Sequence, residues 1–384
     1  MKTFIEIIMN INRSLTSSTI EKGGSLSEID QELNLNETEN ASETSSDPLN
    51  APSSKLFIGF NEDFQCFFCG TESGFYIKNS NPYMDRFHRE LDGGIGIVEL
   101  LGKSNIVALV GGGNNPKYSP AHVVLWDDYQ NMPIAKLEYS SEVKAIRCRG
   151  QRILVVLTHR AMLYNFADLK LIAQYETCAN PNGLCSMISN SNQTIIAIPG
   201  CKEGDLRIEM TESKRSFAIN AHQTALSNIV ISLNGKLCAT TSNKGTLIRI
   251  WNCEDGSLNR ELRRGIEQAN ILSLNFKPSG DGLCLSSDKG TIHIYSLVDR
   301  KEAKELHEKN KKSSLSFMKR YLPDYFSSEW SQTNFSVPHS KRSICSFTPD
   351  DSNTIMILTE DGRYYKYRYL PGEDLVQLIA TEKF

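Results

Sequence analysis

From residue 55 to residue 384, short runs of β-branched and aromatic residues alternate with Gly, Asn and Asp. A period of two, bounded by turn residues, is typical of β-strands, and a helical period is scarce. We therefore expect an all-β fold over residues 55–384. Residues 1–54 are rich in Ser, Asn, Glu and Thr and poor in aromatics, which predicts a disordered N-terminal tail.

A polar hairpin turn followed by an alternating strand recurs along the folded region. Residues 242–251 match residues 287–296 at an offset of 45. A period of ~40–45 residues is the signature of a propeller in which each repeat forms a four-stranded blade. Seven copies predict a seven-bladed WD-type β-propeller, with looser copies starting near residues 71, 113, 158, 199 and 359.

The gap before the last copy, from 287 to 359, is 72 residues and predicts an insertion at about 298–338. This segment mixes Lys and Arg with large apolar side chains. One interpretation is a surface loop whose aromatics pack back on a blade. The other is a membrane-insertion loop, in which basic residues attract anionic lipid while apolar side chains enter the bilayer interface. The candidates for insertion are Leu315, Phe317, Met318 and Leu322.

The charge is unevenly distributed along the chain. Residues 1–54 contain nine acidic and three basic residues, a net charge of -6, so the total of -3 leaves +3 for residues 55–384. A mildly basic propeller permits an anionic partner without requiring one. No segment has the length and hydropathy of a transmembrane helix, so we expect any membrane contact to be peripheral.

The ten cysteines form no regular disulfide framework, which favours a reducing compartment. Cys66 and Cys69 form a lone C-x-x-C, and on a strand they would point to opposite faces, so we expect no metal site. Phosphate-binding, hydrolase and metalloprotease motifs are missing from the sequence. We expect no enzyme activity, no cofactor and no nucleic-acid partner.

The adjacent pair Arg263 and Arg264 lies before Gly265, between the two best repeats. In an extended segment neighbouring side chains point to opposite sides, so the two arginines are expected to serve two recesses. One recess would face the preceding repeat and the other the following repeat. Arginine suits phosphate because its planar fork forms bidentate hydrogen bonds and stays charged at physiological pH.

The order and spacing of residues 221–222, 239–250, 262–265 and 286–293 resemble the PROPPIN family. These are WD-repeat propellers that bind phosphatidylinositol 3-phosphate and the 3,5-bisphosphate in autophagy. Leu262 stands where the family motif usually has Phe. This substitution resembles a subgroup with a Leu-Arg-Arg-Gly motif, whose members associate with large lipid-transfer proteins. The resemblance places first-pocket contacts at His222, Ser242, Thr246, Arg249 and Arg263, and second-pocket contacts at Arg264, Ser286, Ser287, Thr291 and His293.

The resemblance implies a monomeric, peripheral effector and scaffold of autophagosome formation, on preautophagosomal or phagophore and endosomal membranes. It also implies an autophagy lipid-transfer protein as partner, near Asn61 and Asp63. The alternative is a WD-repeat scaffold that grips acidic or phosphorylated peptides without lipid specificity. Taken singly, the hydroxyl and histidine residues could instead make hairpin and blade hydrogen bonds. If His222 or His293 gains a proton at the site, binding should tighten as pH falls through ~6.5.

Overall fold

The structure is a computed structural model that describes residues 55–102, 104–298, 329–338, 342–350, 353–371 and 375–384. All of these belong to one compact unit, Ser54–Phe384. The predicted tail at residues 1–54 and the four candidate insertion residues from Leu315 to Leu322 lie outside the described residues. None of the described residues forms a helix with the length and hydropathy needed to cross a bilayer.

The described residues form 29 strands in seven sheets. Blades one to four each contain four strands that follow one another in the sequence. Their bounds are β1 (Lys55–Phe60), β2 (Cys66–Thr71), β3 (Gly74–Ser80) and β4 (Tyr83–Glu90); β5 (Ile95–Leu100), β6 (Ile106–Gly111), β7 (His122–Asp127) and β8 (Met132–Glu138); β9 (Ala145–Arg149), β10 (Arg152–Val156), β11 (Arg160–Asn165) and β12 (Leu171–Glu176); β13 (Ser186–Ser189), β14 (Thr194–Pro199), β15 (Asp205–Met210) and β16 (Arg215–Asn220).

The remaining three blades include two strands from the predicted insertion. Blade five is β17 (Leu226–Ile231), β18 (Leu237–Ser242), β19 (Leu247–Asn252) and β20 (Leu258–Arg263), with β24 (Glu329–Trp330) as a fifth strand. Blade six is β21 (Ile271–Phe276), β22 (Gly282–Ser287), β23 (Thr291–Ser296) and β25 (Thr333–Ser336). Blade seven is β26 (Ser343–Phe347), β27 (Thr354–Thr359), β28 (Arg363–Tyr369) and β29 (Val376–Lys383).

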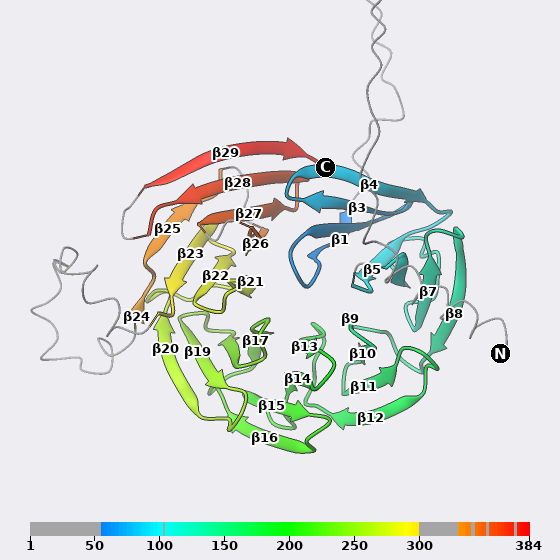
Figure 1. Ribbon diagram of the computed structural model, residues 1–384, viewed down its shortest axis with the longest axis horizontal. Helices are drawn as coiled ribbons and strands as arrows, with labels where there is room; N and C mark the ends of the chain where they lie inside the picture. The colour runs from blue at the N-terminus through cyan, green and yellow to red at the C-terminus, as the bar shows by residue number, and fades with distance from the viewer. Residues whose placement is uncertain (1–54, 103, 299–328, 339–341, 351–352, 372–374) are drawn as a thin grey trace, which may run out of the picture. The chain divides into compact units, whose positions relative to one another are not determined.

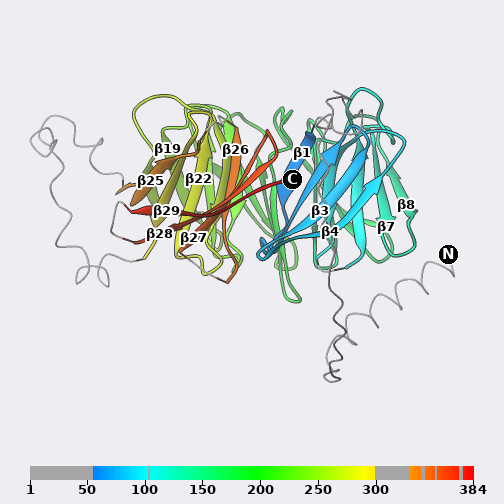
Figure 2. The ribbon, with the colours of Figure 1, turned by 90° about the horizontal axis from the view of Figure 1, so that it is seen from above.

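The seven blades surround a common axis, with the first strand of each blade innermost and the outermost strands on the rim (Figure 1). Figure 2 shows the strands running between the two faces of the ring. Each predicted hairpin turn lies between the second and third strands of a blade. The prediction of a seven-bladed β-propeller is therefore confirmed.

The segment predicted as an insertion supplies blade structure at its end. β25 pairs antiparallel with β23 and completes blade six, while β24 pairs parallel with the end of β20 in blade five. The chain therefore leaves β23 at blade six, touches the edge of blade five at β24, and returns to blade six. This crossing brings the end of the segment directly beside Arg263.

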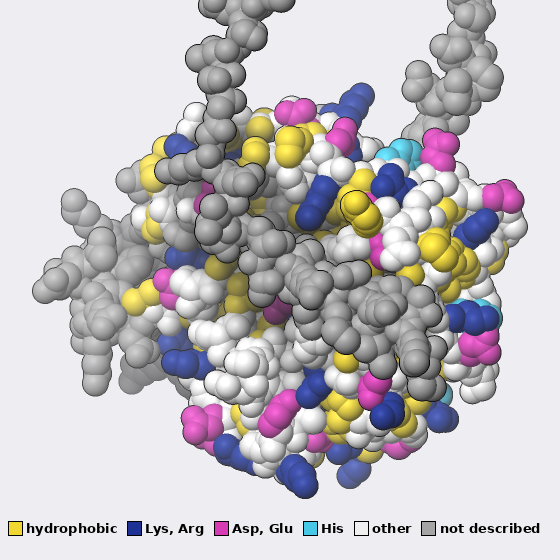
Figure 3. All heavy atoms as spheres, turned by 45° about the vertical axis from the view of Figure 1, so that its right-hand side comes forward, with side chains coloured by type: hydrophobic (Ala, Val, Ile, Leu, Met, Phe, Trp, Pro, Cys, Tyr) yellow, Lys and Arg dark blue, Asp and Glu magenta, His cyan; other side chains and the backbone are white. Residues whose placement is uncertain are grey.

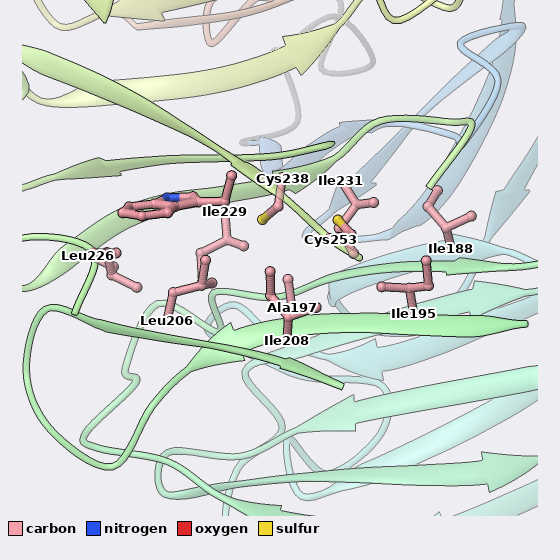
Figure 4. Close-up of a cluster of buried hydrophobic side chains, with 12 residues drawn as sticks. Ile188, Ile195, Ala197, Leu206, Ile208, Leu226, Ile229, Ile231, Cys238 and Cys253 are labelled. Atoms are coloured by element: carbon pink, nitrogen blue, oxygen red, sulfur yellow. The ribbon is translucent and has the colours of Figure 1, made fainter. Parts of the chain in front are cut away.

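The core lies between neighbouring blades because the inner strands carry apolar residues on both faces. Strands β2, β6, β14 and β27 are buried along their whole length. Figure 4 shows one such layer, where blade-four and blade-five side chains interdigitate. Its members include Ile195, Ala197, Leu206, Ile208, Ile229, Ile231, Cys238, Trp251 and Cys253.

Side chains, rather than a shared strand, join the first and last blades among the described residues. The Tyr364 hydroxyl donates to the Ser80 carbonyl at 2.7 Å, and the Tyr83 hydroxyl donates to the Lys383 carbonyl at 2.7 Å. Phe67 is fully buried, and its ring centroid lies 5.0 Å from that of Phe384. This aromatic layer closes the ring.

A cavity of about 300 Å³ lies among the innermost strands and contains a buried charge cluster. Arg149 donates from Nη1 to Glu99 at 2.6 Å, and its Nε lies 3.3 Å from a Glu62 carboxylate oxygen. The side chains of Arg149 and Glu99 are only 11% and 3% exposed. Burial raises the pKa of Glu62. These contacts tie blades one, two and three together at the axis.

Candidate functional site

Arg263 and Arg264 lie at the end of β20 and face different neighbouring blades. Cross-strand partners share a face of an antiparallel sheet. Arg263 pairs with Leu247, and Glu261 pairs with Arg249, so these residues share the face of Trp251, which packs on blade four. Leu262 points the other way, into the cluster shared with blade six. By the same alternation Arg264 faces blade six, as expected from the sequence.

The first group of predicted site residues faces blade four. Arg249 donates from Nη1 to the Ala221 carbonyl at 2.7 Å and from Nε to the Glu261 carboxylate at 2.9 Å. Ser242 shares this face because it continues the alternation of Cys238 and Thr240 along β18. Arg249, Arg263 and Ser242 therefore share one face of blade five with the Glu261 carboxylate.

His222 belongs to the hydrogen-bonding framework of blade five. Its Nε2 lies 3.0 Å from the Thr240 hydroxyl oxygen, which also accepts a hydrogen bond from Trp251 Nε1 at 3.0 Å. The imidazole is buried, at 5% exposure. Only its other nitrogen, Nδ1, could serve a ligand while this network stays intact.

The second group faces blade six and centres on Arg264, which is 9% exposed. Its Nε donates to the Gly245 carbonyl at 2.7 Å, and its Nη2 donates to the Glu267 carbonyl. Main-chain carbonyls thus orient the guanidinium without cancelling its charge. A guanidinium has five N–H donors, so these two bonds leave donors that can serve a bound anion.

Glycine is required at position 245, where φ is +59° and a Cβ would lie 1.9 Å from the Ala269 carbonyl oxygen. The tight turn at 242–245 therefore packs directly on the loop that follows Arg264. The Thr246 carbonyl accepts a hydrogen bond from the Arg264 main-chain N–H at 2.9 Å. Thr246 thus contacts the second arginine through its main chain, although the resemblance assigns it to the first pocket.

Three of the four blade-six residues predicted for the second pocket join Arg264. His293 pairs with Leu285, which packs towards blade five, and Thr291 shares the face of His293. The Ser287 and Thr291 hydroxyl oxygens are 2.9 Å apart. His293 Nδ1 lies 3.3 Å from the Ser331 hydroxyl oxygen, just after β24.

Ser286 faces blade seven, away from Arg264. It alternates with Cys284, which packs in the blade-seven cluster, and its hydroxyl donates to the Ser343 carbonyl at 2.5 Å. It is fully buried and also lies 2.8 Å from the Ser273 hydroxyl. This geometry assigns Ser286 to the contact between blades six and seven, and we leave it out of the second group.

The sequence aligned the two best repeats residue by residue at an offset of 45. This alignment is wrong for the third strands of blades five and six, where equivalent residues are 44 apart. Leu285 follows Thr240 by 45 residues, but Thr240 pairs with Arg249 whereas Leu285 pairs with His293. Arg249 and His293, which are 44 residues apart, therefore occupy equivalent places. Blade five has one extra residue between its turn and Arg249. The two groups of predicted site residues consequently differ: one carries an arginine where the other carries a histidine.

Burial lowers the pKa of both histidines to about 4, and the next largest effect comes from a neighbouring arginine, Arg249 for His222 and Arg264 for His293. Both imidazoles therefore stay neutral near pH 6.5 in the unliganded protein. This contradicts the expectation that they become charged there and tighten binding.

The same two histidines should destabilise the fold in acid. An unfolded histidine titrates near 6.5, whereas the folded value is about 4, so the unfolded chain binds more protons between these values. Stability should be complete above pH 6.5 and should fall as the pH drops towards 4. Between pH 7 and pH 5 we expect a loss of about 2 kcal/mol per histidine in urea unfolding. The His293→Gln variant should show a shallower pH dependence; an unchanged slope would contradict this assignment.

Several neighbours of the candidate site residues were not predicted from the sequence. Alternation could have placed Glu261 beside Arg263, because the two are separated by one residue on the same strand. The Gly245 and Glu267 carbonyls and the Ser331 hydroxyl carry no signal in the sequence, because turns and the β24 crossing position them.

Asn61 and Asp63, the predicted partner contacts, form the turn between β1 and β2. Asn61 is buried, and its amide donates to Asp63 at 2.7 Å and its oxygen accepts from the Cys66 N–H at 2.9 Å. Their role in partner binding stays a prediction. The described residues contain no cluster of His, Cys, Asp and Glu suited to a metal ion.

Comparison with known proteins assigns the family. The PROPPIN family model matches residues 55–371. The chain belongs to the PROPPIN family. Autophagy-related protein 18e of Arabidopsis thaliana is 33% identical over 329 residues, 84% of this chain and 86% of that protein. Autophagy-related protein 18 of Dictyostelium discoideum is 31% identical over 334 residues, 82% and 89% of the two chains.

A solved structure of KlAtg21, in complex with the coiled-coil of AgAtg16, has a TM-score of 0.70 and covers 86% of this PROPPIN and 99% of that chain. At 21% identity it supports the fold. Family membership makes this PROPPIN an autophagy-related, phosphoinositide-binding propeller that associates peripherally with membranes. PROPPIN proteins act by binding and are not enzymes.

Proposed function

We propose that this PROPPIN binds phosphatidylinositol 3-phosphate and 3,5-bisphosphate through two recesses, one on each side of blade five. In this role it acts as an effector and scaffold of autophagosome formation on preautophagosomal or phagophore and endosomal membranes. The supporting observation is that Arg263 and Arg264 face different blades, each among hydroxyl groups. Two head groups can therefore bind without competing for one arginine.

The second recess is the better prepared for an anion. Arg264 is held by carbonyls, so its charge is available, and its burial reduces screening by water. The Ser287 and Thr291 hydroxyls lie on the same side and can donate to phosphate oxygens. Charge-assisted hydrogen bonds to a guanidinium are about twice as strong as neutral ones.

The first recess contains a competing carboxylate. Glu261 accepts a hydrogen bond from Arg249, and a phosphate would have to share that arginine or displace the carboxylate. We therefore expect the first recess to bind a soluble head group more weakly than the second. Both together would still give firm attachment, because the first binding event raises the effective concentration of membrane lipid at the other recess.

Long-range attraction contributes little to this attachment. On the face shown in Figure 3, Lys and Arg side chains are interspersed with Asp and Glu. With a net charge of only +3 over residues 55–384, the propeller has little charge to draw it to any anionic surface. Recognition should therefore depend on the arginine pair and on the head group.

A vesicle flotation panel tests the proposed function. Vesicles of equal total charge would contain phosphatidylinositol 3-phosphate, the 3,5-bisphosphate, the 4-phosphate or phosphatidylserine. We expect the 3-phosphorylated lipids to retain the protein at least about tenfold more tightly, a difference that one added charge-assisted bond can supply. Equal binding to all four would support the alternative, a scaffold for acidic or phosphorylated peptides.

We also propose that this PROPPIN is a monomer that recruits a large autophagy lipid-transfer protein, with Leu262 marking the Leu-Arg-Arg-Gly subgroup. The β1–β2 turn at Asn61 and Asp63 is the proposed contact. Asp63 is the better candidate because it is partly exposed, whereas Asn61 is buried. The complex of KlAtg21 with a coiled-coil is a precedent for a protein partner on this fold.

A further inference from the structure

All ten cysteines lie among the residues that the structure describes, and the two that solvent reaches lie beside each other. Eight cysteines are buried in the propeller, whereas Cys178 is half-buried and Cys201 is exposed. Cys178 follows β12 of blade three, and Cys201 follows β14 of blade four. Burial makes the other thiols poor nucleophiles; it raises the pKa of Cys253, for example, to about 12. An oxidant in solvent therefore meets these two thiols first.

A main-chain hydrogen bond sets the separation of the two cysteines. The Cys178 N–H donates to the Gly200 carbonyl oxygen at 2.7 Å, and Cys201 is the residue after Gly200. Adding the standard covalent distances on either side of this bond places the two Cα atoms no more than about 7 Å apart. The pair is therefore within the separation that a disulfide can bridge.

The Cys201 side chain turns towards blade three. Its Sγ lies 3.8 Å from the carbonyl oxygen of Glu176, the last residue of β12 and two residues before Cys178. Between them, the Thr177 N–H donates to the His159 carbonyl at 2.9 Å and fixes this segment to blade three. A thiol carried by blade four thus lies against the segment of blade three that carries the other thiol.

We propose that Cys178 and Cys201 form a peroxide-sensitive pair, whose disulfide joins blade three to blade four. The Cys201 thiolate attacks one oxygen of hydrogen peroxide, which forms a sulfenic acid and releases the other oxygen as water. The Cys178 thiolate then attacks the Cys201 sulfur, which forms the S–S bond and releases the hydroxyl group as a second water. Each thiol proton ends in water, and the two electrons lost by the sulfur atoms reduce the peroxide.

The surroundings of the two thiols set the order of these steps. Cys201 reacts first because it is the exposed thiol. Burial, and next the neighbouring Glu203 carboxylate, raise the pKa of the Cys178 thiol, so less of it is thiolate at neutral pH. Cys178 is therefore protected from direct oxidation and is placed to resolve the sulfenic acid on its neighbour.

The turn that carries Cys201 supports the wall of the first recess. The Gly204 carbonyl accepts hydrogen bonds from the main-chain N–H groups of Ala221 and His222 at 3.1 and 2.9 Å. The Ala221 carbonyl in turn accepts from Arg249 at 2.7 Å. A disulfide at Cys201 would therefore restrain the main chain that holds Arg249, and would make the rigidity of this wall depend on the redox state.

Peptide mapping of the full chain tests the chemistry. After treatment with hydrogen peroxide, we expect a non-reduced digest to contain peptides linked through Cys178 and Cys201, and dithiothreitol should separate them. In Cys178→Ser, dimedone should trap a sulfenic acid on Cys201, whereas Cys201→Ser should leave Cys178 unmodified. Cys253→Ala replaces a buried cysteine and is the matched control, which should form the link like the native chain. A disulfide between two molecules, or oxidation of a buried cysteine in place of the link, would overturn the proposal.

Thermal unfolding and hydrogen exchange test the consequence for the fold. The oxidised native chain should unfold about 3–5 °C higher than the reduced chain, because the link closes the loop from 178 to 201 in the unfolded state. The amides of Ala221 and His222 should exchange about tenfold more slowly, and the same treatment of Cys201→Ser should change neither quantity. Unchanged exchange in a chain that carries the disulfide would overturn the effect on the recess wall. These measurements need no lipid, so their failure would leave the proposed function intact.

Discussion

Replacing Arg263 and Arg264 together with glutamine should reduce binding to vesicles containing phosphatidylinositol 3-phosphate at least about 100-fold, because a hydrogen bond to a charged group contributes roughly 1.5–3 kcal/mol. The two arginines face different blades, so the double variant would empty both recesses and remove the gain from two-site attachment. Flotation and calorimetry with soluble inositol 1,3-bisphosphate would measure the two effects separately.

The structure also predicts how the single variants differ. Arg264→Gln loses the bonds to the Gly245 and Glu267 carbonyls and should cost about 1–3 kcal/mol of stability, because the buried Gly245 carbonyl loses its donor. Arg264→Lys keeps the charge. We expect it to lose little stability but to bind vesicles containing phosphatidylinositol 3-phosphate more weakly than the native chain. Arg363→Gln on β28 of blade seven removes the same charge outside both groups of site residues and is the matched control. If the double variant folds and still binds like the native chain, the arginines are not the phosphate ligands.

Replacing Glu99 with alanine should cost about 3–5 kcal/mol of stability, because it leaves the buried Arg149 charge without its nearest carboxylate. The two groups are 2.6 Å apart and almost fully buried near the axis of the ring. Glu62, whose pKa burial already raises, can compensate only in part. Chemical denaturation at pH 7 measures the loss directly.

The control for this prediction replaces both partners. Glu99→Leu with Arg149→Met removes the buried pair and fills its volume with apolar atoms, which is often neutral. This double variant should therefore be more stable than Glu99→Ala, although it removes two charged side chains instead of one. A cost below about 1 kcal/mol for Glu99→Ala would mean that water reaches Arg149 and replaces the carboxylate.

The sequence predicted those features of the fold that depend on residues close together in the chain. The repeated turn and alternating strand gave seven blades, and alternation alone placed Arg263 and Arg264 on different sides of β20. That placement required only that side chains alternate along an extended strand. Ser287, Thr291 and His293 were expected from the resemblance to the PROPPIN family, and strand pairing turns His293 towards blade five.

Other features depend on contacts between segments that are distant in the sequence. The sequence did not reveal the extra residue before Arg249, because the turn residues of the two repeats align without a gap. Only strand pairing shows that the third strands are offset by one residue. Ser286 resembles a site residue in the sequence, yet strand alternation turns it towards Ser343 of blade seven. The low histidine pKa values arise from burial beside arginines, which no local pattern reports.

The closure of the ring by side chains bears on the order of folding. Tyr364 and Ser80 are 284 residues apart, whereas most strands pair with a neighbour in sequence. Blades can therefore assemble one after another as the chain leaves the ribosome, but the flank of blade one around Phe67 waits until blade seven is made. During that wait an aromatic surface is open to water, so nascent chains stalled before residue 354 should bind chaperones and aggregate more readily than completed ones.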